Sequence, residues 1–125
     1  MKFYAILLAA LGLSTAALAH HSFAAEYDST ASIEVTGVVT KVEWTNPHAY
    51  VYLDVKDASG KVTNWAFEGY PPNTLRRVGF TRDMMKEGQT IHVTGWKARD
   101  NATRGAAREV TFPDGKKAFL GPAAN

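Results

Sequence analysis

Strict alternation of apolar and polar residues governs the middle of the chain. The segment "HAYVYLDVKD", residues 48–57, places an aliphatic side chain at every second position: Ala49, Val51, Leu53 and Val55. A period of two puts successive side chains on opposite faces of a β-strand, so one face is expected in the core. After the turn "DASGK", the segment "VTNWAFEGY" alternates in the same way, with Trp65 and Phe67 on one face. The pattern predicts an antiparallel hairpin.

The residues before this hairpin predict a longer strand. The run "IEVTGVVTKVEW", residues 33–44, is rich in β-branched residues, and its apolar parity changes at Gly37. A glycine at such a change favours a β-bulge or a sharp bend. We therefore expect a first strand bent at Gly37 and followed by a turn at Asn46-Pro47.

Two short helical turns and two more strands are expected after the hairpin. Prolines and a glycine bracket a helical turn over residues 71–79, and Thr81 can cap a second turn that ends at Gly88. Residues 89–99 and 104–112 then predict two strands, and a Pro-Asp-Gly turn precedes a short return.

This order of elements matches a small five-stranded barrel of the oligonucleotide/oligosaccharide-binding (OB) type. The sequence thus predicts an all-β fold, an OB-like barrel with a short helical connection between its third and fourth strands. An open β-sandwich or a half-rolled sheet is compatible with the same pattern. The side chains expected in the core are Val35, Val51, Leu53, Val55, Trp65, Phe67, Ile91 and Val93.

The first 19 residues have the organisation of a secretory leader. Lys2 supplies the positive start, an apolar run of signal-peptide length follows, and Ala17-Leu18-Ala19 places small residues at the cleavage site. We expect cleavage after Ala19, export to the periplasm or beyond, and no membrane span in the product. A retained N-terminal anchor and cleavage after Ala24 are the alternatives. The expected organisation is a signal peptide (1–19), an N-terminal arm (20–32), the OB-like domain (33–120) and a loose tail (121–125).

The composition of the chain after cleavage argues against several functions. The 14 basic residues less Lys2 leave 13, against 12 acidic residues, a formal net charge of +1. Such a balance argues against nucleic acid and against any partner bound mainly through phosphate charge. The sequence contains no cysteine. Disulfides, thiol redox chemistry and zinc–thiolate sites are therefore excluded, and any metal site must use nitrogen and oxygen ligands.

Three histidines are the candidate metal ligands. Cleavage after Ala19 would make His20 the N-terminal residue, whose α-amine and imidazole can chelate one ion together. A further imidazole, from His21 or from His48 at the entrance of a strand, would complete a three-nitrogen set. Ligands of this kind suit copper(II) among the divalent ions. The alternative is that these histidines are solvated or form local hydrogen bonds.

Several aromatic residues and one carboxylate define a candidate ligand face outside the core. A carbohydrate or a small apolar ligand could use such a face without a basic surface. Packing of the aromatic rings across strands and under loops is the alternative. The candidate residues are Trp44, Tyr50, Tyr52, Glu68 and Trp96.

The sequence contains no recognisable catalytic constellation. No pair of carboxylates has a spacing that fixes catalytic separation, and nucleophile-elbow and phosphate-binding glycine motifs are lacking. We therefore expect a periplasmic or secreted binding or accessory module that holds copper through its N-terminal histidine. The alternatives are a copper-dependent redox or hydrolytic enzyme and an OB-like domain that binds a small molecule or carbohydrate.

Five segments along nearly the whole mature chain share one resemblance: "HHSFAAEYD", "GVVTKVEWTNPHAYVYLDVKDASGKVTNWAFE", "PNTLRRVGFTRD", "GQTIHVTG" and "FPDGKKAF". Together they resemble a family of small exported bacterial proteins grouped as a domain of unknown function. The resemblance implies this fold type, export, and recurrence of the His-His-Ser-Phe start and the Trp-Thr-Asn-Pro-His segment. The turn "FEGYPPN" departs from the family pattern, in which a turn bearing leucine or serine is expected before the proline.

Overall fold

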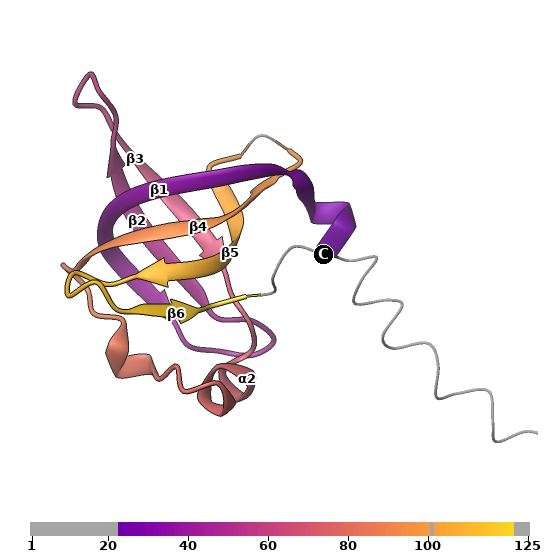
Figure 1. Cartoon of the computed structure of the whole chain (residues 1–125). Coiled ribbons are helices and arrows are strands. Elements are labelled where there is room, and N and C mark those ends of the chain that lie inside the picture. Colours follow the sequence, from indigo (N-terminus) through magenta and orange to yellow (C-terminus); the bar gives the residue numbers. More distant parts are fainter. Residues whose placement is uncertain (1–22, 101, 122–125) are drawn as a thin grey trace, which may run out of the picture.

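The alternating pattern forms an all-β structure, as predicted, in a computed structural model that describes residues 23–100 and 102–121 (Figure 1). The strands are β1 (Tyr27–Glu43), β2 (Tyr50–Lys56), β3 (Val62–Glu68), β4 (Thr90–Ala98), β5 (Arg104–Thr111) and β6 (Lys117–Phe119). Two short helical elements connect β3 to β4 where the sequence predicts them: α2 (Pro72–Arg77) and η1 (Arg82–Met84). Within the described ranges, no helix is both long and apolar enough to cross a bilayer.

The strands form one sheet in the order β3-β2-β1-β4-β5-β6, in which neighbours run antiparallel. β6, which the five-stranded prediction leaves out, is the short return after the Pro-Asp-Gly turn. A parallel pairing also joins β3 to β5, with Glu68 opposite Ala106. Figure 1 shows β1 curving around the sheet between its two neighbours, β2 and β4. Because β3 pairs with β5, the end of β3 meets the start of β5. The candidate site lies at this junction.

β1 begins earlier than the sequence predicts. It starts at Tyr27, inside the segment 20–32 that is expected to be an arm, and Tyr27 lies opposite Ala98 of β4. Asp28 Oδ1 accepts hydrogen bonds from both the backbone N–H and the hydroxyl of Thr30. Local side-chain contacts thus satisfy hydrogen-bonding groups of this irregular stretch. No alternation of apolar residues marks it as a strand in the sequence.

The irregularity of β1 against β2 lies between Val39 and Lys41, so the bulge predicted at Gly37 is wrong in position. Val39 is buried, whereas Val38 is 41% exposed. Gly37 is needed for a different reason. A Cβ atom at this position would lie 2.6 Å from the backbone oxygen of Asp54, so the two strands approach too closely for a side chain.

The predicted core residues all contribute to the main core. Five are fully buried, and three are partly buried and pack against them: Val51, Leu53, Phe67, Ile91 and Val93, then Val35, Val55 and Trp65. Leu75, Phe80 and Met85 join the same cluster from the helical connection. This connection is therefore packed on the sheet and is part of the folded core.

A second apolar cluster anchors the beginning of the described chain. Residues 23–26 are helical, and the Phe23 ring centre lies 5.4 Å from that of Tyr27 and 5.9 Å from that of Trp96. Tyr27 and Trp96 are buried there with two alanines of β4 and β5. Arg99 donates hydrogen bonds to two backbone carbonyl groups of this segment, at 2.6 and 2.9 Å. Residues 23–27 are therefore held against the sheet.

Candidate functional site

His48 lies between β1 and β2, beside the end of β3. The N–H of Ala49 donates to the carbonyl of Tyr70 at 3.2 Å, and the carbonyl of Ala49 accepts from Gly69 at 2.8 Å. His48 Nδ1 lies 3.1 Å from the carbonyl oxygen of Gly69. A carbonyl oxygen only accepts, so Nδ1 carries the hydrogen, and Nε2 of the neutral ring keeps its lone pair. The side chain is 43% exposed, so solvent reaches the ring.

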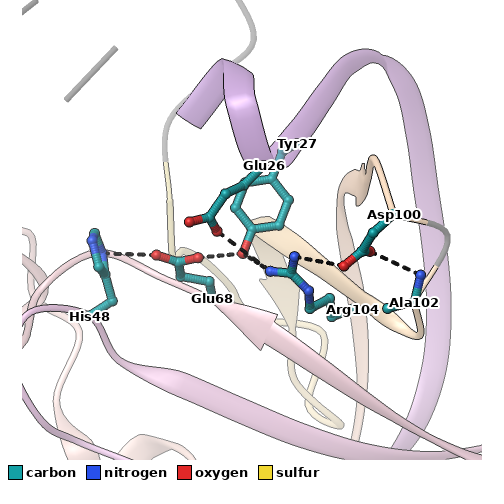
Figure 2. A network of polar contacts seen from close by, with 7 residues as sticks. All are labelled: Glu26, Tyr27, His48, Glu68, Asp100, Ala102 and Arg104. Atoms are coloured by element: carbon teal, nitrogen blue, oxygen red, sulfur yellow. Dashed lines mark hydrogen bonds and ion pairs between the residues drawn. The ribbon is translucent and has the colours of Figure 1, made fainter. Parts of the chain in front are cut away.

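Glu68, the last residue of β3, connects His48 to Tyr27. Its Oε1 lies 3.4 Å from His48 Nδ1, and its Oε2 accepts a hydrogen bond from the Tyr27 hydroxyl (Figure 2). The Glu68 side chain is only 15% exposed. A largely buried carboxylate thus presents one oxygen to an imidazole and the other to a phenol.

Arg104 lies on the other side of Tyr27 and joins three segments of the chain (Figure 2). Its guanidinium lies 5.6 Å from the centre of the Tyr27 ring, and Nη1 lies 3.5 Å from both the Tyr27 hydroxyl and Glu26 Oε2. Nη2 donates to Asp100 Oδ2 at 3.1 Å, and this bond raises the pKa of Arg104. A bond from the N–H of Ala102 lowers the pKa of Asp100. Both groups therefore stay charged at neutral pH.

Two phenols beside Glu68 stay protonated. Burial, followed by the hydrogen bond to Glu68 and the charge of Glu68, raises the pKa of Tyr27 far above its ordinary value. Tyr50 lies opposite Glu68 in the β2–β3 register, and burial followed by the Glu68 charge raises its pKa to about 12. Both phenols are neutral hydrogen-bond donors in neutral solution.

The structure brings three of the predicted site residues together: His48, Tyr50 and Glu68. Tyr52 lies next to them on the same strand, with its ring centre 6.4 Å from that of Tyr50. Lys41 Nζ lies 5.4 Å from the centre of the Tyr52 ring. His20 and His21, the other predicted metal ligands, lie outside the described residues.

The two tryptophans of the candidate ligand face differ in their relation to Tyr50. Trp96 is 5% exposed and reaches the site only through its cluster with Phe23 and Tyr27. Trp44 packs on the main core and stacks on Phe80 at a centroid distance of 6.1 Å. Its buried Nε1 has no hydrogen-bond partner among the described residues. Trp96 thus belongs to the second apolar cluster, whereas Trp44 and Tyr50 line one small pocket.

Tyr27 and Arg104 are the site residues that the sequence does not single out. Tyr27 is the only aromatic residue in the polar stretch "AAEYDSTAS". A lone aromatic residue in such a stretch indicates burial and does not by itself indicate a site. Arg104 follows an irregular loop, and its neighbours Glu26 and Asp100 are ordinary surface charges in the sequence. Only the pairing of β3 with β5 and of β1 with β4 brings these residues to Glu68.

The arrangement supplies one imidazole with a carboxylate behind it. A histidine that ligates a metal through one ring nitrogen commonly donates from the other nitrogen to a carboxylate or a backbone carbonyl. His48 Nδ1 faces both kinds of acceptor. In the part of the chain that the structure describes, no three His, Asp or Glu side chains gather in a way that could hold a metal ion. His48 can therefore act as one ligand, and the others must come from elsewhere.

A comparison with protein families places the chain in a family. Residues 8–108 match the model described as "Family of unknown function (DUF6152)", which covers most of the chain, and the chain belongs to that family. The resemblance seen in the sequence is confirmed at this level. No match is found among curated proteins.

Proposed function

We propose that this member of the DUF6152 family is an exported copper-binding accessory module, in which His20 and His48 ligate one Cu(II) ion. The proposal assumes cleavage after Ala19 and release into the periplasm or the medium. His20 would then supply its α-amine and its imidazole, and His48 would supply Nε2. His21 is an additional candidate ligand. Nitrogen ligands of this kind match the preference of Cu(II).

The observation that carries the proposal is the hydrogen bonding of His48. Nδ1 faces the Gly69 carbonyl at 3.1 Å and Glu68 Oε1 at 3.4 Å, which leaves the Nε2 lone pair for a ligand. The neutral imidazole nitrogen is the commonest metal ligand in proteins. An ordinary surface histidine gains no such orientation from its surroundings.

The anchoring of residues 23–27 supports the pairing of His20 with His48. Tyr27 bonds to Glu68, which in turn faces His48, so the end of this anchored segment is linked to the imidazole through Glu68. Only three residue steps separate Phe23 from His20. An extended chain spans about 3.3–3.6 Å per residue, so His20 stays within about 11 Å of Phe23.

We also propose that the sheet is a closed barrel of the OB type, formed over residues 33–120 and extended at its start by the first part of β1. The parallel pairing of β3 with β5 supports closure. β3 is one edge of the sheet, β5 lies near the opposite edge, and their pairing joins the two sides of the strand order. Closure in the order β1-β2-β3-β5-β4 is the arrangement of an OB barrel. Residues 122–125, at the end of the tail predicted over 121–125, lie outside the described residues.

The test combines intact-mass analysis of the exported protein with copper titration. Three forms are compared: the mature protein, the same protein with one extra N-terminal residue, and His48→Ala. We expect a mass that corresponds to a start at His20, and much weaker copper binding by both altered forms. Equal binding by the extended form would eliminate the α-amine as a ligand and contradict the proposal. Copper-dependent turnover of an oxidisable dye, above that of free copper, would identify an enzyme instead.

A groove supports a second candidate function, the binding of a small polar ligand or carbohydrate. It has a volume of about 520 Å³ and lies across β1, β4 and β5, where Ser32, Glu34, Thr94, Trp96 and Arg108 contribute to its lining. Hydroxyl, charged and aromatic groups together suit a polar ring. Chemical-shift changes of the Trp96 indole on addition of neutral oligosaccharides would support this function, and unchanged spectra at millimolar ligand would contradict it.

A further inference from the structure

Glu68 divides its two carboxylate oxygens between two partners. Oε1 faces His48 Nδ1 at 3.4 Å, and Oε2 accepts the hydrogen bond of Tyr27 (Figure 2). We infer that Glu68 is the positioning residue of the copper site: it orients His48, strengthens its Nε2 as a ligand, and is itself held by Tyr27. This inference rests on the proposed function and deepens it, because it assigns the support of the ligand to named residues.

The backbone holds Glu68 and His48 in a fixed relation. Gly69, directly after Glu68, bonds to Ala49, directly after His48, at 2.8 Å. On its other side Gly69 approaches Leu120 so closely that a Cβ would lie 2.8 Å from the leucine Cγ and 2.9 Å from its oxygen. The end of β3 is thus confined between two segments. The backbone beside Glu68 and the backbone beside His48 therefore cannot separate without breaking the Gly69–Ala49 hydrogen bond.

Tyr27 holds the carboxylate without neutralising it. Its hydroxyl is buried with the rest of the side chain, which is 3% exposed. Arg104, the cation that contacts the Tyr27 hydroxyl, bonds to Asp100 and approaches Glu26, so its charge is matched by these acidic residues. A phenol donates a hydrogen bond and carries no positive charge. The negative charge of Glu68 therefore remains available to the imidazole.

A carboxylate beside Nδ1 favours one tautomer of the imidazole. In that tautomer the hydrogen is on Nδ1, and the Nε2 lone pair is free to bind a metal. The Gly69 carbonyl supports the same tautomer but has only a partial charge. Removal of supporting groups of this kind typically lowers metal affinity about 10- to 100-fold. Loss of the Glu68 charge should fall in this range.

The experiment compares the mature protein with Glu68→Gln and with a matched control, Glu43→Gln. Glu43 is a carboxylate at the end of β1 that pairs with Lys41 at 2.7 Å; it lies opposite Tyr50 and takes no part in the His48–Glu68–Tyr27 contacts. Copper affinity is measured by competition titration, and the imidazole nitrogens of His48 are observed by NMR in metal-free protein. We expect Glu68→Gln to weaken copper binding about 10- to 100-fold and Glu43→Gln to leave it unchanged. In metal-free Glu68→Gln, the amide can donate to Nδ1, so the population should shift toward hydrogen on Nε2.

The two measurements separate failure of the inference from failure of the proposed function. If the mature protein binds copper and Glu68→Gln binds it equally well, the inference is overturned and the copper function stands. If the mature protein binds no copper, the proposed function fails, and an unchanged tautomer in Glu68→Gln overturns the positioning role as well. Tyr27→Phe provides a second variant if Glu68→Gln does not fold. It should weaken binding in the same direction and less severely, whereas unchanged binding would count against the inference.

Discussion

Tyr27 donates a hydrogen bond to Glu68 and so joins the first residue of β1 to the last residue of β3, 41 positions further along the chain. Neither strand pairs with the other in the sheet order. The contact therefore ties the N-terminal segment to the end of a strand that it reaches only through side chains.

Tyr27→Phe should destabilise the folded protein by about 1–3 kcal/mol. The change removes a donor from a carboxylate that is 15% exposed, and solvent replaces that donor poorly. Urea unfolding measures the difference. A double-mutant cycle with Glu68→Ala, which removes both carboxylate oxygens, should give a coupling of at least about 0.5 kcal/mol, and strictly additive effects would show that the hydrogen bond contributes nothing.

Leu75→Ala should cost about 2–5 kcal/mol, because the leucine is fully buried in the main core. Val78→Ala, one turn further along, provides the control. Its side chain is 60% exposed, and the expected change is within about 0.5 kcal/mol. Thermal unfolding of both variants tests whether α2 is part of the core. Similar costs for the two changes would contradict this placement.

Gly95→Ala should be among the most damaging single changes, with a loss above about 4 kcal/mol. A Cβ at Gly95 would lie 1.9 Å from the backbone oxygen of Ala106, so β4 and β5 would have to separate. Gly60→Ala tests the contrast between steric and conformational cost. Gly60 has φ +86° and nothing within 4 Å of the added carbon, so the expected cost is about 1–2 kcal/mol from backbone conformation alone. Chemical denaturation of the two variants should rank them in this order.

Asp57→Asn should remove an acid-sensitive part of the stability. Asp57 Oδ1 accepts hydrogen bonds from the N–H and hydroxyl of Ser59 and from the N–H of Lys61. The Ser59 bond is the first cause of a pKa below the ordinary 3.8. The stabilisation is therefore present above about pH 4 and is lost as the pH falls through the lowered pKa.

The melting temperatures of the wild type and Asp57→Asn should differ at neutral pH and converge near about pH 2. Ser59→Ala should behave like a weaker version of Asp57→Asn. A constant difference between the wild type and Asp57→Asn at all pH values would show that the Asp57 carboxylate does not act through its charge.

The parts of the fold that local periodicity encodes could be predicted from the sequence. Alternation located β2, β3 and the core positions, and prolines and glycines located the helical connection. The start of β1 could not be predicted, because the bonds of Asp28 to Thr30 replace apolar alternation there. The bulge was misplaced because Gly37 reports close approach to Asp54, and not a change of register.

The candidate site was predictable only in part. His48 stood out because it follows a proline turn, and Tyr50 and Glu68 because they lie on the polar side of alternating strands. Tyr27 and Arg104 gave no local signal. They meet because β1 pairs with β4 and β3 pairs with β5. Pairing between strands so far apart cannot be predicted from any short stretch of sequence.

Tyr27 finds its hydrogen-bonding and charged partners 41 and 77 positions further along the chain. Contacts of this separation form only after the intervening loops have closed. Residues 23–27 therefore cannot be fixed by these contacts until β3 and β5 have been synthesised.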